Sequence, residues 1–421
     1  MSVFHGKTIA MGVSRFEVVL DEEIYHGGSP ISGKIYLDLD SSLKVRGIEI
    51  RYKGEGNVRW KHEGSGTHTC KATESYLRER SYIYGNGEDE SEIPEGNHVF
   101  PFNWNLPSNI PCSFESFYGK IRYSIKAVVD RPWKFDYAIK VPFTVAPILD
   151  LNSIPLAREP VSEENSKVFG GSSETLTMTV LLPVRGYVSG QTIPVRVKLQ
   201  NQSKVAVEKV HIFLEKDITY HAGEDHITRK EVVVEMKLNV IEEHGEGLIG
   251  KFRVPPLPPS IMPHSSIIDV SYKIKVEAQV EGWFHKNLKV KTDILIGTIP
   301  LLSYELPRRL SRSSRQSSMA ETVEDIEVED SVDTSDAHRS ASKIFYSHQE
   351  SAETPEDHEE RVRSLARPAY HRCPNTRVAK IVEEELGRPS ESDSDEEIAS
   401  SFYPRYPVYE FFDSLFLEDS E

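Results

Sequence analysis

The feature that most constrains this chain is a recurring alternation of apolar and polar side chains in its first three hundred residues. Residues 16–20, 34–40 and 48–52 place apolar side chains at every second position. A repeat of two is typical of strands with one face buried and the other in water. Glycine-rich turns separate the runs, and no long segment shows the repeat of 3.6 that marks an amphipathic helix. The pattern predicts an all-β protein built of antiparallel β-sandwiches.

The strand-like runs fall into two groups. A polar segment with two prolines and two glycines, residues 153–172, separates them. We therefore predict an N-terminal sandwich at 10–152, a hinge or linker at 153–172 and a C-terminal sandwich at 173–302. The later runs expected to form strands are 121–129, 175–182, 194–199, 209–214, 231–240 and 267–280.

The acidity of the chain is concentrated in residues 303–421. That segment has 28 acidic and 14 basic residues, whereas residues 1–302 have 38 and 36. Because apolar residues are sparse in it, the segment cannot bury enough surface to offset its chain entropy. It predicts a disordered acidic tail with a regulatory role. The formal charge of −16 argues against nucleic acid as a partner.

Three cysteines, Cys70, Cys112 and Cys373, are too few for a disulfide framework in 421 residues. This count is typical of a reducing compartment. The apolar runs are shorter than the roughly 20 residues needed to cross a bilayer, and the N-terminus does not resemble a signal peptide. We therefore expect a cytoplasmic protein.

Several short motifs occur in an order that resembles the arrestin domain-containing proteins, the α-arrestins. The first half has blocks at 101–107, 112–123, 130–133 and 150–152, and the second half has blocks at 185–190, 201–203, 254–260 and 296–300. The residues of the first half that carry the resemblance are Pro101, Phe102, Trp104, Phe114, Glu115, Tyr118, Gly119, Arg122, Tyr123, Asp130, Arg131, Pro132, Trp133, Asp150, Leu151 and Asn152. Those of the second half are Gly186, Tyr187 and Gly190.

The resemblance implies two arrestin-type sandwiches joined by a short hinge. It also implies a non-enzymatic adaptor that binds cytoplasmic tails or loops of membrane proteins and links them to endocytic and ubiquitin-dependent trafficking. Such a protein would be recruited from the cytoplasm to the plasma membrane or endosomes, with peripheral membrane contact. The alternative is a signalling scaffold or a retromer-like sorting protein that recruits no ubiquitin ligase.

The tail lacks the Pro-Pro-x-Tyr motif by which α-arrestins recruit WW-domain ubiquitin ligases. It has three degenerate versions that keep one proline and the tyrosine, and these predict weakened WW binding. A Tyr-x-x-hydrophobic pattern at 409–412 also resembles a sorting signal, and the apolar cluster at 402–417 suggests a docking peptide. The degenerate motifs are formed by Pro368 with Tyr370, Pro404 with Tyr406, and Pro407 with Tyr409.

Two serine clusters in the tail are candidate phosphorylation sites. One follows arginines and fits a basophilic kinase, and the other lies among acids and fits an acid-directed kinase. A helix that would fold on a partner is also expected at 376–386. The candidate serines are Ser311, Ser314, Ser317, Ser318, Ser390, Ser392 and Ser394.

We find no nucleophile beside an evident base and no phosphate-binding glycine loop, so we predict no enzyme activity and no cofactor. The segment 221–226 has two histidines and two acids that could gather around zinc, but an exposed hairpin loop is the preferred interpretation. His62 and His68, which flank a glycine turn, are interpreted in the same way.

Some side chains are expected to be structural. Trp104 and Trp133 are predicted core anchors, because sandwiches need large aromatics. The prolines at 255–259 are expected to form a structural loop rather than an SH3 ligand. The thioredoxin-interacting branch of the family has a cysteine at the position that aligns with Ser265, so thiol exchange at that position is excluded.

Overall fold

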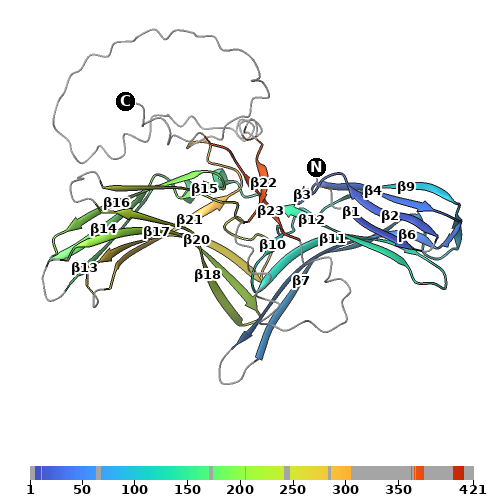
Figure 1. Ribbon diagram of the computed structural model, residues 1–421, viewed down its shortest axis with the longest axis horizontal. Helices are drawn as coiled ribbons and strands as arrows, with labels where there is room; N and C mark the ends of the chain where they lie inside the picture. Colours follow the sequence, from blue (N-terminus) through green and yellow to red (C-terminus); the bar gives the residue numbers. More distant parts are fainter. Residues whose placement is uncertain are drawn as a thin grey trace, which may run out of the picture.

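The computed structural model describes residues 5–10, 12–62, 68–169, 174–203, 205–240, 247–282, 286–304, 362, 365, 367–373 and 402–411. Nearly all of its regular structure is β-strand, arranged as two sandwiches side by side (Figure 1). The prediction of an all-β double sandwich is therefore confirmed. In the described ranges, no helix is both long and apolar enough to cross a bilayer.

The first sandwich has two main sheets. The first has the strand order β1 (His5–Ala10), β2 (Val13–Leu20), β4 (Pro30–Leu39), β9 (Gly96–Asn105). The second has the order β3 (Ile24–His26), β12 (Tyr137–Ala146), β11 (Gly119–Asp130), β6 (Gly47–His62), β7 (His68–Gly85), and β10 (Phe114–Glu115) also pairs with β11. The short strands β5 (Leu43–Val45) and β8 (Ser91–Ile93) form a separate pair.

The alternation seen in the sequence sets which face of each strand is buried. In β2 the side chains of Phe16, Val18 and Leu20 are buried, and in β4 those of Ile35 and Leu37 are buried. These residues meet the inner face of the opposite sheet, so period-two patterning alone positions most of the core.

The second sandwich repeats this plan. One sheet has the order β13 (Val161–Val168), β14 (Thr175–Leu182), β16 (Thr192–Asn201), β19 (Leu248–Arg253). The other has the order β15 (Gly186–Val188), β21 (Leu288–Gly297), β20 (Ile268–Val280), β17 (Val207–Ala222), β18 (Asp225–Asn239). The edge strand β13 lies within the segment 153–172 that the sequence suggested as a linker.

The two halves share one uncommon detail. In each, a three-residue strand pairs in parallel with the last long strand of the sandwich: β3 with β12, and β15 with β21. Both short strands carry a buried tyrosine, Tyr25 and Tyr187, and a glycine with positive φ follows each, Gly28 and Gly190. The two sandwiches therefore have the same corner at equivalent places.

A short connection links the sandwiches. It contains the 3-10 turn η1 (Leu151–Ser153) and the helical turn α1 (Pro155–Arg158). Asp150 caps η1 through its side chain, and its backbone forms an isolated bridge to Ile299 at the end of the second sandwich. The hinge is thus tied to the second sandwich by backbone contacts.

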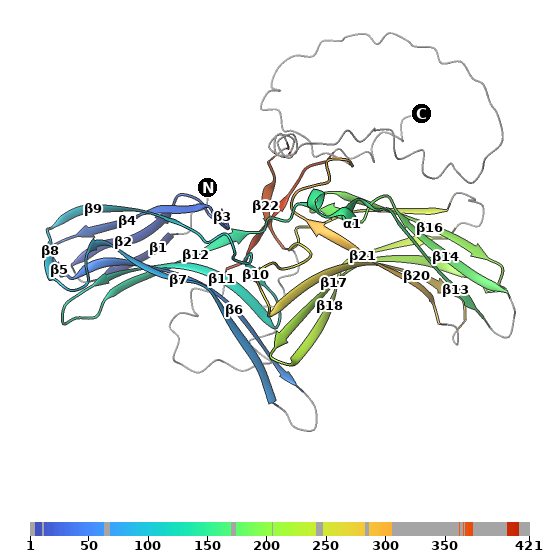
Figure 2. The ribbon, with the colours of Figure 1, turned by 180° about the vertical axis from the view of Figure 1, so that it is seen from behind.

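Two segments of the acidic tail also form strands. β22 (Ala369–Arg372) and β23 (Arg405–Val408) pair antiparallel and lie between the two sandwiches (Figures 1 and 2). Neither strand was expected from the sequence. Apart from residues 303–304, 362, 365, 367–373 and 402–411, the predicted disordered tail lies outside the described residues, and so does the predicted helix at 376–386.

One expectation about the core is wrong. Trp133 is 98% exposed, in the turn between β11 and β12, with φ of 60°. The buried residues at this end of β11 are smaller ones, Val128 and Val129. Trp104, by contrast, is half-buried and stacks on Tyr52 with ring centroids 4.8 Å apart.

The proline run at 255–259 lies between β19 and β20, with Leu257, Pro258 and Pro259 buried. The carbonyl of Pro258 accepts a hydrogen bond from the Tyr272 hydroxyl at 2.7 Å. These contacts support the interpretation of the run as a structural loop.

Candidate functional site

The candidate site is the junction of the two sandwiches, which both halves build with polar and aromatic side chains. The Tyr220 hydroxyl donates to Ser116 Oγ at 2.9 Å, and Arg229 lies over the ring of Phe117 at 4.1 Å. On another part of the junction, the backbone N–H of Ser266 donates to Glu74 Oε2 at 3.2 Å. The junction is a specific interface because directional contacts fix how the two halves meet.

Ser265, the position discussed for thiol exchange, is part of this interface. Its hydroxyl accepts a hydrogen bond from Tyr76 at 3.0 Å, across the junction. Burial raises the pKa of Tyr76, and the hydrogen bond to the Glu74 carboxylate adds to this rise. The side chain at 265 therefore connects the sandwiches structurally.

The tail hairpin packs into the junction through two tyrosines, the first of which is Tyr406. Its side chain is fully buried, and its hydroxyl donates to the carbonyl of Ser113 at 3.3 Å. Complete burial raises the pKa of Tyr406 well above its usual value. A small pocket beside it is lined from both sandwiches and from the tail, by Glu115, Lys216, Pro258, Cys373, Pro404 and Tyr406 itself.

Tyr409 makes the second contact, this time with the second sandwich. Its backbone N–H donates to the carbonyl of Ser189 at 3.0 Å, and its hydroxyl donates to the carbonyl of Thr298 at 2.9 Å. Its own carbonyl accepts from Arg253 at 3.4 Å. The second sandwich thus satisfies both the backbone N–H and the carbonyl of Tyr409, the N–H through a backbone carbonyl as in strand addition.

Gly190 permits this close approach. It has φ of +94°, and a Cβ at this position would overlap the carbonyl oxygen of Tyr409. Only glycine combines that backbone conformation with that space. Gly190, one of the residues that carry the family resemblance, therefore also forms part of the surface that binds the tail.

Polar contacts tie the tail hairpin to the first sandwich as well. Arg405 pairs with Glu23 at 3.0 Å, and the hydroxyl of Tyr370 lies 3.3 Å from His26 Nε2. Burial lowers the pKa of His26, so the neutral ring is favoured at this contact. The hairpin therefore contacts both sandwiches.

The prolines and tyrosines of the degenerate motifs are therefore wholly or partly shielded from solvent, whereas WW binding needs them exposed. Pro404, Pro407, Tyr406 and Tyr409 are buried, and Pro368 and Tyr370 are half-buried. A WW groove binds both residues of its ligand on an exposed polyproline II helix. While the hairpin is docked, these side chains are occupied. Phe412 of the sorting pattern and all the candidate phosphoserines lie outside the described residues.

The residues of the family motifs lie mainly at structural positions. Phe114, Tyr123, Leu151 and Tyr187 are buried, and Asp130 pairs with Arg46 at 2.5 Å. Several other motif side chains make contacts within or between the sandwiches, whereas Trp133 is exposed. These contacts are the ion pair of Arg122 with Glu115, the cation–π contact of Arg131 with Tyr137, the hydrogen bonds of Asn152 to Asp150 and to the carbonyl of Pro300, and the packing of Tyr118 on Tyr220.

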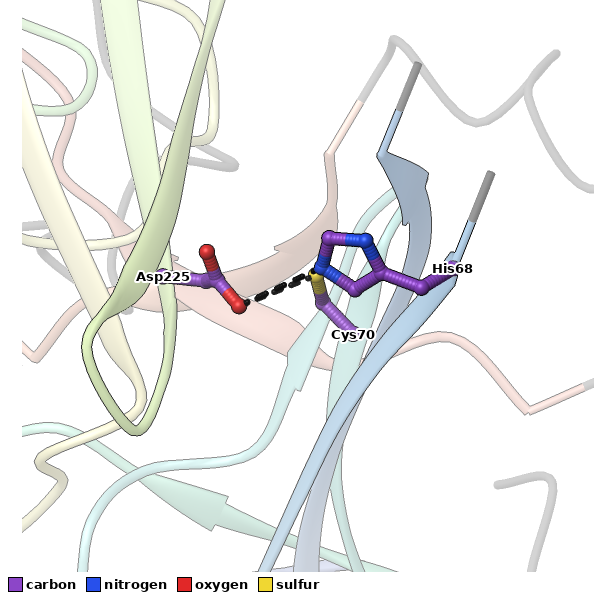
Figure 3. Close-up of side chains that lie close together, drawn as sticks. All are labelled: His68, Cys70 and Asp225. Atoms are coloured by element: carbon purple, nitrogen blue, oxygen red, sulfur yellow. Dashed lines mark hydrogen bonds and ion pairs between the residues drawn. The ribbon is translucent and has the colours of Figure 1, made fainter. Parts of the chain in front are cut away.

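A second group of side chains forms where the tips of two long hairpins meet. His68 and Cys70 come from β7, and Asp225 comes from β18 (Figure 3). Asp225 Oδ2 lies 3.4 Å from Cys70 Sγ and 3.6 Å from His68 Nε2, and the three donor atoms all lie within 4.8 Å of one another. Burial of the thiol, with the nearby Asp225 carboxylate, raises the pKa of Cys70.

The sequence placed Asp225 in a candidate hairpin loop at 221–226, and β17 and β18 do form that hairpin. His221 Nε2 lies 2.8 Å from Asp269 Oδ2, and the ring of His221 lies 6.2 Å from that of His226. The grouping of Asp225 with Cys70 joins residues 155 positions apart, and no local pattern signals it.

Two sandwiches that meet at a directional junction, with an extended segment of the tail seated there, have the architecture that the resemblance to the arrestin domain-containing proteins implied. In agreement, residues 16–152 match the family model for the arrestin (or S-antigen) N-terminal domain, and residues 172–301 match that for the C-terminal domain.

Curated relatives give the same result. The chain is 32% identical over 315 residues to arrestin domain-containing protein 17 of Caenorhabditis elegans, covering 69% of this chain and 72% of the relative. It is 29% identical over 314 residues to arrestin domain-containing protein 4 of Mus musculus, covering 70% and 73%. The chain belongs to the arrestin domain-containing family.

Proposed function

We propose that this protein is a non-enzymatic adaptor that binds cytoplasmic segments of membrane proteins and links them to endocytic, ubiquitin-dependent trafficking. Its family membership supports the adaptor role. Its site also suits binding rather than catalysis, since the junction offers backbone partners and tyrosine pockets to a peptide.

The observation that carries this proposal is the seating of the tail at the junction. An extended segment, 402–411, is bound there by two buried tyrosines and by hydrogen bonds of the Tyr409 backbone to the Ser189 carbonyl and to the Arg253 guanidinium. A surface that binds one extended tyrosine-containing peptide in cis has the chemistry to bind another in trans. We propose that cargo peptides of this type compete with the tail for the junction.

Because the tail motifs are buried or half-buried in the docked hairpin, they can bind either the sandwiches or a WW-domain ligase, but not both at once. When the hairpin is docked, Tyr406 and Tyr409 are bound to the sandwiches, and when it is released they become available to WW-domain ligases. A tethered segment has an effective concentration on the order of millimolar, so a competing ligand must displace it against that concentration. Cargo binding would in this way expose the ligase motifs.

The test is binding of an isolated WW domain from a ubiquitin ligase to the full chain, measured by calorimetry with and without release of the tail. Gly190→Ala should release it, since the new Cβ would overlap Tyr409 while the motifs stay intact. We expect WW affinity to rise at least several-fold in this variant. Gly223→Ala is the matched control, because Gly223 also has positive φ but has no atom within 4 Å of an added Cβ.

Equal WW affinity in wild type, Gly190→Ala and Gly223→Ala would contradict the masking of the motifs. No WW binding by any of them would favour the alternative function, a scaffold or sorting protein without ligase recruitment. Proximity labelling in cells then separates the two, with Pro368, Pro404 and Pro407 changed to alanine. Loss of ligases with retention of membrane cargo supports the proposed adaptor.

A further inference from the structure

The cluster of His68, Cys70 and Asp225 has the composition of a transition-metal site. It offers one imidazole nitrogen, one thiol sulfur and one carboxylate oxygen, which together form a donor set that zinc accepts. An exposed acidic cluster would offer oxygens only. The mixed donors favour a borderline-soft cation over calcium or magnesium.

The spacing of the donors fits one ion. Tetrahedral zinc, with bonds of about 2.0–2.3 Å, separates neighbouring ligand atoms by roughly 3.3–3.7 Å. The sulfur–oxygen distance here is 3.4 Å and the nitrogen–oxygen distance is 3.6 Å. The three side chains point toward a common centre (Figure 3). A metal could therefore be bound with small side-chain adjustments.

The backbone also favours a preformed site. His68 and Cys70 are two residues apart on β7, so their side chains leave the strand on the same side. Asp225 is the first residue of β18 and pairs with Ala222, the last residue of β17, so it lies where the β17–β18 hairpin closes. Two strands of ordered sheets, not mobile loops, supply the donors, as a defined coordination geometry needs.

We propose that His68, Cys70 and Asp225 bind one zinc-type divalent ion, and that this ion joins the first sandwich to the second. The ligand atoms are Nε2, Sγ and Oδ2, and a fourth position is left for water or an exogenous ligand. Because the donors come from both sandwiches, the bound ion would stabilise the angle at which they meet.

Cobalt(II) is the direct probe, added to the metal-free full chain in a reductant that does not itself bind metals. Wild type should bind one equivalent and show the near-ultraviolet thiolate-to-cobalt charge-transfer band, which zinc should remove by displacement. Cys70→Ser should lose the band. Asp225→Asn and His68→Gln each alter a proposed ligand, so each should weaken zinc binding by at least about 100-fold, because loss of a group that only supports a ligand already costs about 10–100-fold.

Two variants are matched controls. Cys373→Ser removes a different cysteine, which also forms no disulfide, and Glu224→Gln neutralises the exposed carboxylate next to Asp225. Both should keep the band and the affinity. Zinc should also raise the melting temperature of wild type and of the controls, but not that of Asp225→Asn. Cobalt binding without a thiolate band, or a band lost equally in Cys373→Ser, would overturn the proposal.

Discussion

Single residues at the junction have properties that the sequence does not reveal. Tyr406 and Tyr409 look like exposed tail tyrosines beside prolines, yet both are buried and bonded to backbone carbonyls. Tyr406 bonds to Ser113, about 290 positions away, and Tyr409 bonds to Thr298, about 110 positions away. The prediction that Trp133 is a core anchor failed for a related reason. An aromatic residue type alone does not determine whether the side chain of a turn residue faces the core or the solvent.

The burial of Tyr406 gives tail docking a pH dependence. The docked tyrosine has a raised pKa and keeps its proton, whereas in a released tail it loses the proton above about pH 10. The contribution of Tyr406 to docking is therefore complete below that pH and falls as the pH rises, by up to about tenfold per unit. Cleavage of the tail by an alkali-stable protease, relative to a free tail peptide, should measure this loss.

Tyr406→Phe is the control for this effect. It keeps the ring but removes the ionisable group, so release should depend less steeply on pH in the variant. The hydroxyl donates to Ser113, so the variant should also dock more weakly at neutral pH, by about 1 kcal/mol. Identical pH profiles for the variant and wild type would contradict the assignment.

At the scale of strands and hairpins, the sequence predicted the elements whose two faces differ. β2, β4 and β20 alternate cleanly and β11 does so in part, and all four were expected close to where they lie. β7 was not expected, because it is an edge strand whose burial pattern is mostly exposed and whose side chains are largely charged or polar. Hydrophobic alternation cannot reveal a strand that has little to bury.

The tail hairpin was missed for another reason. β23 contains Pro407 and follows Pro404, and prolines normally argue against a strand. Its partner β22 lies more than thirty residues earlier in a segment of disordered composition. Only the surfaces of the two sandwiches give this short pair a reason to form, so its stability is tertiary.

The ion pair between Arg405 and Glu23 offers a test of hairpin docking. Arg405→Glu or Glu23→Arg alone places like charges together, and each should increase tail release about two- to fivefold, as for a partly exposed pair. The double variant should restore docking. Hydrogen exchange of residues 402–411 is the measurement, and failure of the double variant to recover would contradict a direct pairing.

At the scale of the whole molecule, the sequence predicted two sandwiches and their order but not how they meet. Each sandwich follows from local alternation, whereas the junction depends on single contacts such as Tyr220 to Ser116 and Arg229 to Phe117. The candidate metal cluster is a further example, since its donors come from different sandwiches. Contacts between separately folded units leave little periodic signal in a sequence.

The junction should couple the unfolding of the two sandwiches. Tyr220→Phe removes the hydroxyl that reaches Ser116 and should reduce the coupling by about 1 kcal/mol. In calorimetry, we expect the unfolding transitions of the two halves to separate or broaden. Tyr272→Phe is the control, because its hydroxyl bonds to Pro258 within one sandwich. Equal behaviour of the two variants would show that the junction does not couple the halves.

The repeated corner of the two sandwiches has one more consequence. Tyr370 lies against the end of β3 at His26, and Tyr409 against the residues just after β15, at Ser189 and Gly190. The tail thus contacts the same corner in both sandwiches, through Tyr370 in the first and Tyr409 in the second. Both contacts can form only at one separation of the two corners, so a ligand that moves the sandwiches apart by a few ångströms must break one of them.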